Sequence, residues 1–186
     1  MPEKSAWDRT MKNSFDPLFG AQGENGAAAS GFAPAPWLAE APLNAGFAPL
    51  DRILDRARAG LAAEMLGTAA QSFDMTLDYL KNRVQFGQPI GSFQALGHRA
   101  SILFTEMEMA RSCIEAALQA IDNDADDADN IAKLCSLAKF KANAFLHHMS
   151  NELIQIHGGI GMTDEFDAGL FLKRARATEA TFGNEA

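Results

Sequence analysis

The chain has 186 residues, 47% of them hydrophobic and 22% charged, and its formal net charge is −8. This acidic balance argues against sequence-independent binding to nucleic acid or to an anionic membrane surface, because both need a basic face. No uncharged apolar run approaches the roughly 20 residues of a membrane span, and the start lacks the apolar core of a secretory signal, so we expect a cytoplasmic protein.

Residues 1–50 are rich in Gly, Pro, Ala and Asn and show no sustained helical or strand period. They predict a loop-rich, irregular N-terminal arm. The arm carries more large apolar side chains than a disordered tail usually does, among them Phe15, Phe32 and Trp37. Two interpretations therefore stay open, a disordered arm and an arm docked against the rest of the chain or a partner subunit.

Residues 51–186 show the pattern of an all-α domain, in which apolar residues recur at steps of three and four. Such a stripe predicts a first helix from about residues 48–51 to about Phe86. Two glycines and a proline within residues 87–91 end this helix. Ser92 is placed to cap a second helix that runs to about Ile121.

An acidic stretch follows at residues 122–129, without the central glycine and closing glutamate of a calcium loop. We interpret it as a solvated turn before a third helix, residues 130–157. Glycines within residues 158–161 end that helix, and Thr163 is placed to cap a short fourth helix over residues 164–177. Three long helices and one short helix joined by short turns predict an antiparallel four-helix bundle.

Metal or disulfide chemistry has little support in the sequence. Cys113 and Cys135 lie in apolar helical stripes without metal-ligand spacing, which indicates buried free thiols in a reducing compartment. The Glu-x-x-His pairs of four-helix metal proteins are absent. The sequence therefore predicts no metal site.

The turn after the first helix, residues 83–94, places a cation, amides and an aromatic ring around exposed backbone. Arg83 is able to pair with a phosphate, and Gln94 starts the second helix, where the helix dipole favours an anion. Phe86 offers its face to a flat ring. On spacing alone, a helix-end arginine and a packed phenylalanine explain the same residues.

A second cluster, residues 155–161, combines Gln155 and His157 with three glycines. Glycines allow a ligand or another chain to approach the backbone closely, and the Gln155 amide both donates and accepts hydrogen bonds. His157 has two interpretations, a group that titrates near neutral pH and, more simply, a partner of the helix dipole.

Together, the segments RVQFGQPIGSFQ (residues 83–94) and QIHGGIGMT (residues 155–163) resemble the two most recognisable motifs in the C-terminal domain of the acyl-CoA dehydrogenase family. The resemblance covers nearly the whole chain after Gly46. It implies a four-helix bundle that assembles into dimers or dimers of dimers with FAD between subunits, and a substrate-binding role for Arg58. The residues that it implies as FAD contacts are Arg83, Gln85, Phe86 and Gln94 from one subunit and Gln155 and Gly159 from its neighbour.

The sequence departs from the family at the catalytic base. A family member uses a carboxylate to remove the proton alpha to an acyl-CoA thioester, while the beta hydrogen passes to the flavin as hydride. The usual base position, near the C-terminus, holds Phe182 here, and the alternative position before Arg58 holds Ala57. A phenyl ring cannot accept a proton, so catalysis needs another carboxylate, for which Glu179 and Glu185 are the nearby candidates.

The family's N-terminal helical domain and middle β-domain have no counterpart in the fifty residues upstream of the bundle. We therefore expect a domain that contributes to FAD binding and subunit assembly but is not active alone. Its partner is expected to be a second copy, in a homodimer, or a base-bearing acyl-CoA dehydrogenase subunit, in a heteromer, with acyl-CoA bound only in the assembly. The alternative is a non-catalytic helical oligomerisation module without flavin.

Overall fold

The computed structural model of the chain describes residues 46–123 and 127–184. Nearly all of the expected N-terminal arm, residues 1–50, lies outside the described residues. Within them the fold is all-α, which confirms the expected class, with four α-helices, two short 3₁₀ helices and one two-stranded hairpin. In chain order, the elements are α3 (Phe47–Asn82), β1 (Val84–Gln85), β2 (Gln88–Pro89), η1 (Ile90–Ser92), α4 (Gln94–Asp122), α5 (Ala128–His157), η2 (Gly158–Met162) and α6 (Ala168–Ala180).

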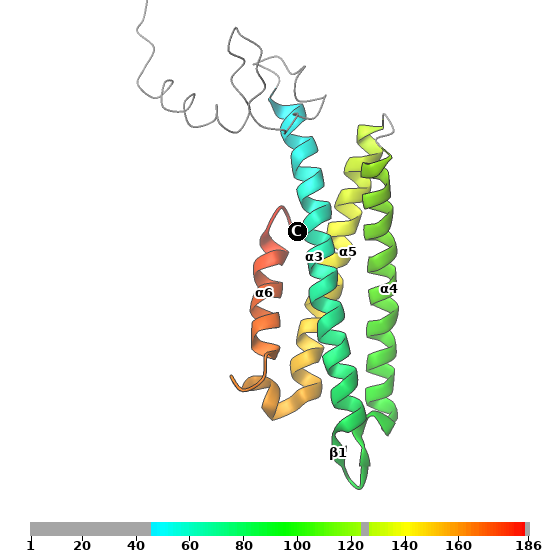
Figure 1. The fold of residues 1–186 in the computed structure, drawn as a ribbon, viewed down its shortest axis with the longest axis vertical. Helices are drawn as coiled ribbons and strands as arrows, with labels where there is room; N and C mark the ends of the chain where they lie inside the picture. The colour runs from blue at the N-terminus through cyan, green and yellow to red at the C-terminus, as the bar shows by residue number, and fades with distance from the viewer. Residues whose placement is uncertain (1–45, 124–126, 185–186) are drawn as a thin grey trace, which may run out of the picture. The chain divides into compact units, whose positions relative to one another are not determined.

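The four helices form an antiparallel bundle in which α3, α4 and α5 are long and α6 is short (Figure 1). α5 packs against both α4 and α6, and one continuous core receives apolar residues from every helix. Burial of one large aliphatic side chain in such a core stabilises the fold by about 1.5–3 kcal/mol. The large apolar side chains that are fully buried are Met65, Leu103, Ile114, Leu146, Met149 and Leu153.

The first helix is shorter than its apolar stripe predicted, because the chain leaves α3 at Asn82 and folds into the hairpin of β1 and β2. The strands pair antiparallel and leave a two-residue turn. Both turn residues have positive φ, 53° at Phe86 and 79° at Gly87, as a type I′ hairpin turn requires. The stripe misled because Val84 lies four residues after Leu80 and so continues the helical spacing, although the helix has already ended at Asn82.

The two expected helix caps, Ser92 and Thr163, are wrong, and one cause explains both. Each hydroxyl closes a 3₁₀ turn instead of a helix. That of Ser92 donates to the Pro89 carbonyl at 2.7 Å, and that of Thr163 donates to the Ile160 carbonyl at 2.8 Å. α4 and α6 therefore begin further along the chain than predicted.

The cap of α5 comes from the end of the acidic stretch. The Asp127 carboxylate accepts a hydrogen bond from the backbone N–H of Asn130 at 3.0 Å, which satisfies one of the free donors at the start of the helix. Among the described residues, no three His, Cys, Asp or Glu side chains are grouped to hold a metal ion. None of the helices in this part of the chain has the length and apolar character needed to cross a membrane.

Candidate functional site

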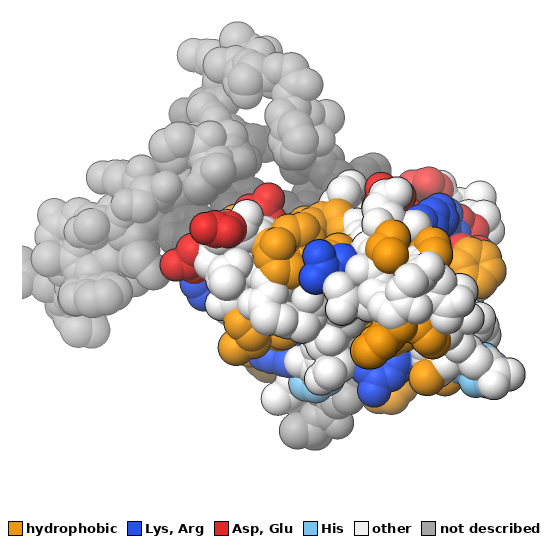
Figure 2. All heavy atoms as spheres, turned by 90° about the horizontal axis from the view of Figure 1, so that it is seen from below, with side chains coloured by type: hydrophobic (Ala, Val, Ile, Leu, Met, Phe, Trp, Pro, Cys, Tyr) orange, Lys and Arg blue, Asp and Glu red, His pale blue; other side chains and the backbone are white. Residues whose placement is uncertain are grey.

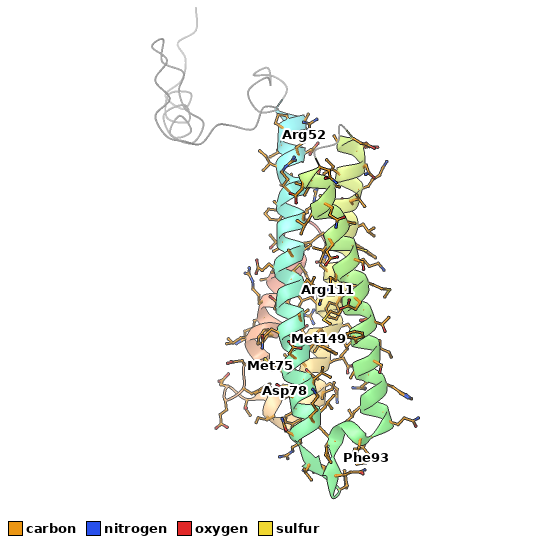
Figure 3. All side chains as sticks on the ribbon, turned by 45° about the vertical axis from the view of Figure 1, so that its right-hand side comes forward. Arg52, Met75, Asp78, Phe93, Arg111 and Met149 are labelled. Carbon is orange, nitrogen blue, oxygen red and sulfur yellow. The ribbon has the colours of Figure 1, made fainter. Side chains whose placement is uncertain are left out.

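The hairpin lies at the end of the bundle where α3 is joined to α4, and its tip is Phe86. Figure 3 shows Phe93 at this end and Arg52 at the other. The Phe86 side chain is 92% exposed, and its ring meets that of Phe93 edge-on with centroids 6.0 Å apart. A bulky residue at positive φ stores about 1–3 kcal/mol of strain, which burial does not offset here. Strain of this kind gathers at ligand sites, so the tip is a candidate contact for a flat ring.

Arg83 stands at the base of the hairpin, with its backbone held on both sides. Its N–H donates to the Tyr79 carbonyl at 2.9 Å, and its own carbonyl accepts from the Ile90 N–H at 2.8 Å. The Arg83 side chain is exposed and forms no hydrogen bond or ion pair with any residue that the structure describes. A guanidinium on a fixed backbone, with its donors unused, is suited to bind a phosphate in bidentate fashion.

The two glutamines of the first motif differ in how far they are committed. The Gln85 amide nitrogen donates one of its two protons to the Val84 carbonyl at 2.9 Å, so its other proton and its side-chain oxygen are left for other partners. Gln94 is exposed and is the first residue of α4, where backbone N–H groups lack intrahelical acceptors. Both lie at the same end of the bundle as Arg83.

The second motif, at the end of α5, lies at this end of the bundle too (Figure 1). An aromatic stack joins it to the last turn of α3, just before the first motif. The His157 ring stacks on the ring of Tyr79, with centroids 4.3 Å apart, and on that of Phe166, at 4.4 Å. The Tyr79 hydroxyl donates to the His157 carbonyl at 3.4 Å. Since the Tyr79 carbonyl accepts from Arg83, the structure brings the two distant motifs together.

His157 itself is a packed, neutral ring. It is 3% exposed, and its Nδ1 donates to the Leu153 carbonyl at 2.7 Å. Nε2 is buried and has no hydrogen-bond partner among the described residues. Burial lowers the pKa of His157, against a smaller opposing effect of the bond to Leu153. These observations favour a packing role over a charged partner of the helix dipole.

The glycines of the second motif divide into open and packed positions. Gly159 is exposed, and a Cβ placed on it has no described atom within 4 Å. Gly161 is buried, and a Cβ there lies 3.0 Å from the Ile154 carbonyl oxygen. Gln155 is exposed on the last turn of α5. Gly159 and Gln155 therefore leave room for a ligand or another chain, whereas Gly161 serves the turn.

A hollow of about 440 Å³ adjoins the hairpin, between the end of α3, β2 and η1, and the start of α4. At Gly91 the backbone of the hollow's wall comes close to α3, and only glycine fits there, because an added Cβ would lie 2.9 Å from the Leu80 carbonyl oxygen. Figure 2, which looks at the bundle from below, shows apolar side chains beside basic ones. The hollow is lined by Leu77, Leu80, Lys81, Pro89, Gly91, Ser92, Gly97 and Ala100.

Arg58 lies elsewhere, beside the turn that follows α6. Its Nη1 pairs with the Asp55 carboxylate at 2.8 Å, and its Nε donates to the backbone carbonyl of Phe182 at 3.2 Å. The structure thus places Arg58 next to the usual base position, where it contacts the backbone of Phe182 and not its side chain. The Arg58 side chain is 30% exposed, so one edge still faces solvent.

The candidate replacement bases gain no support from the structure. Arg176 holds the Glu179 carboxylate at 2.7 Å, and His147 Nδ1 lies 3.3 Å from it. Glu185 lies outside the described residues. Nothing in the described part of the chain therefore places an unengaged carboxylate at the turn after α6.

Two buried charges at this turn were not singled out by the sequence pattern. Asp55 is 6% exposed and Lys139 is 4% exposed. The available signal for Lys139 was its place within the apolar stripe of α5, beside Ala138 and one turn after Cys135. Burial raises the pKa of the Cys135 thiol, and the Asp55 charge raises it further, so this thiol stays protonated.

The geometry agrees with comparisons to known proteins. Residues 44–186 match the family described as "Acyl-CoA dehydrogenase, C-terminal domain". The chain belongs to the acyl-CoA dehydrogenase family, which confirms the resemblance of its two motifs.

Individual relatives support the same assignment. The chain is 39% identical over 131 residues to acyl-CoA dehydrogenase IpdE2 of Mycolicibacterium smegmatis. The matched segment covers 70% of this chain and 39% of that protein. Butyryl-CoA dehydrogenase from Megasphaera elsdenii matches with a TM-score of 0.68 and 26% identity, over 73% of this chain and 35% of its own. A chain of the ChsE4-ChsE5 complex from Mycobacterium tuberculosis matches with a TM-score of 0.64 and 27% identity, over 70% and 35%. The chain thus spans less than two fifths of each of these proteins.

Proposed function

We propose that this chain completes an FAD site and the subunit assembly of an acyl-CoA dehydrogenase, and that it does not dehydrogenate acyl-CoA alone. When bound, FAD supplies the hydride-accepting chemistry, and the residues of this chain bind and orient it. One observation carries the proposal. At one end of the bundle, Arg83, which has no side-chain partner among the described residues, stands beside the strained and exposed Phe86.

The residues of the hairpin end fit the adenosine diphosphate portion of FAD. In the proposal, Arg83 pairs with the phosphates and Phe86 lies against a flat ring. Gln94 adds the N-terminal end of α4, which favours a negative group, and Gln85 offers its second amide proton as a donor.

Gln155 and Gly159 serve the FAD of a neighbouring subunit in this proposal. Two features support a role at an interface. Both residues are exposed, and the space over Gly159 is open for the backbone to be approached closely. FAD is then shared across the contact between subunits.

The turn after α6 supports a base-bearing partner. Phe182 offers no proton acceptor, and the Glu179 carboxylate is engaged by Arg176. A homodimer lacks the base in both copies, so the heteromer with a base-bearing acyl-CoA dehydrogenase subunit is the form we favour. Arg58 borders the acyl-CoA in that assembly, with its guanidinium oriented by Asp55.

The test is a titration of the purified chain with FAD, alone and with a base-bearing partner, following flavin fluorescence and sedimentation together. Loss of charge-assisted bonds to phosphate costs about 1.5–3 kcal/mol, so Arg83→Ala should weaken FAD binding roughly tenfold to a hundredfold. Lys133→Ala removes a cation near the start of α5, at the other end of the bundle, and should leave binding unchanged. The proposal is contradicted if FAD binds saturably with the same affinity in Arg83→Ala, or if FAD does not bind the chain either alone or with the partner.

A helical oligomerisation module without flavin is the second candidate. Exposed apolar side chains on the outer surfaces of α4 and α5 favour it, since Ile102 is 52%, Met109 48% and Leu137 41% exposed. The same titration separates the two functions. A module of this kind associates in sedimentation while flavin fluorescence stays unchanged.

A further inference from the structure

Lys139 is a buried lysine in the middle of α5. Its 4% exposure is unusual, because lysine side chains are almost never fully buried unless their charge is met. It follows Ala138 and precedes Ala142 on the face of α5 that joins the core. The side chain therefore needs polar partners within the fold.

Those partners lie where α6 ends. The Lys139 ammonium donates to the Asn143 side-chain oxygen at 2.6 Å and to the backbone carbonyls of Thr178 at 3.1 Å and Glu179 at 3.3 Å. The last carbonyls of a helix lack intrahelical donors and form the negative end of its dipole. One buried cation thus satisfies the C-terminal end of α6 from a different helix.

The same ammonium reaches past the helix into the turn. It also lies 3.1 Å from the Gly183 carbonyl oxygen, so its three protons are shared among four acceptors. Arg58 Nε donates to the preceding carbonyl, that of Phe182, at 3.2 Å. Two consecutive carbonyls are therefore held by two cations from two helices, α5 and α3. Asp55 fixes the second cation at 2.8 Å.

The backbone between these two contacts is left-handed. Phe182 has a φ of 59° and Gly183 a φ of 113°. A phenylalanine does not favour this region by itself, so contacts from outside the turn must impose it. The Phe182 ring is 43% exposed and does not anchor the turn by deep burial.

We infer that Lys139 is the positioning residue for the turn after α6, and that its bond to Gly183, helped by Arg58, sets the backbone at Phe182. The side chain at position 182 is then placed by α5 and α3 rather than by its own contacts. The turn that carries the phenyl ring at the usual base position is therefore held without any contribution from that ring's own burial. The inference concerns this chain's own backbone and holds whether or not FAD binds.

The test compares Lys139→Met with Lys141→Met, a matched change two residues along the same helix. Backbone order parameters of the full chain are measured by NMR relaxation. In the wild type and in Lys141→Met, Phe182 and Gly183 should show the value of rigid backbone, about 0.85. In Lys139→Met they should fall below about 0.6 while the core of the bundle keeps its order. Lys139→Arg, which keeps the charge and donors, should restore part of the order.

The outcome that overturns the inference is an unchanged turn in a folded Lys139→Met chain. A second measurement covers the case in which this variant does not fold. In the wild type, the Lys139 ammonium protons should exchange slowly with water and give a signal in a nitrogen-edited spectrum, assigned by its absence in Lys139→Arg. A folded wild-type chain without a protected lysine ammonium overturns the inference as well.

Discussion

The hairpin end of the bundle and the turn after α6 use their cations in opposite ways. At the hairpin, Arg83 extends from a fixed backbone without a side-chain partner among the described residues. At the turn, Arg58 and Lys139 are both bonded within the chain. Donors that are unused and rigidly supported are available to a ligand. Donors bonded to the chain's own carbonyls hold the backbone in shape, and this difference separates the two candidate sites.

The largest expected effect tests whether the turn region is held by buried charge. Asp55→Ala leaves Arg58 without its carboxylate, and we expect the free energy of unfolding to fall by about 2 kcal/mol, less than for a fully buried pair because Arg58 is partly exposed. Urea denaturation measures it. Asp51→Ala, an exposed position on the same helix, should change stability by less than about 0.5 kcal/mol. Equal losses in the two variants contradict a structural role for the pair.

Two glycines sharpen the comparison within the second motif. Gly161→Ala forces a Cβ to 3.0 Å from the Ile154 carbonyl oxygen and should destabilise the fold by about 1–2 kcal/mol. Gly159→Ala enters open space and should leave the free energy of unfolding within about 0.5 kcal/mol of the wild type. If Gly159 admits a ligand, the second variant lowers FAD affinity in the assembly without loss of stability. The pair is measured by denaturation and flavin titration side by side.

Phe86 offers a test in the stabilising direction. Phe86→Asn creates Asn-Gly, the preferred pair for a type I′ turn, and relieves the positive φ of a bulky residue. Loss of the edge contact with Phe93 offsets part of the gain, so we expect about 0.5–1 kcal/mol more stability. FAD affinity should fall at the same time. A variant that is both less stable and equally tight for FAD shows that the tip stores no functional strain.

The smallest effect is a dependence of stability on pH through His157. Its pKa is lowered in the fold, so the unfolded chain takes up a proton first, near its ordinary value of about 6.5. Stability from the neutral ring is complete above that pH and is lost as pH falls toward the lower folded value. Unfolding free energies of the wild type and His157→Gln, compared at about pH 7.5 and 5.5, should converge at the lower pH. A constant difference contradicts the effect.

The periodic parts of the fold were predictable, and the places where local and tertiary preferences compete were not. Leu103 and Met149 sit in the core as their helical spacing predicted. The hairpin was missed because its tip is Phe86 rather than the asparagine that usually signals such a turn. Ser92 has the side chain of a helix cap, but its hydroxyl donates to the Pro89 carbonyl within the 3₁₀ turn η1 instead.

The candidate site shows the same division. The candidate residues could be chosen from the two motifs, because a glycine-rich turn beside a cation can be recognised in the sequence alone. Their meeting through the Tyr79 and His157 rings is a tertiary contact between residues 78 positions apart. The burial of Lys139 likewise depends on where α6 ends, which no spacing along α5 reveals.

The central claim of the proposal is that the hairpin end contacts FAD, whereas the turn after α6 contributes nothing to FAD binding. The most direct measurement compares the FAD affinity of the wild type, Arg83→Ala and Phe182→Ala in the assembly with a base-bearing partner. The account predicts that Arg83→Ala weakens binding roughly tenfold or more and that Phe182→Ala leaves it within about twofold. Loss of affinity in Phe182→Ala with retention in Arg83→Ala would contradict it.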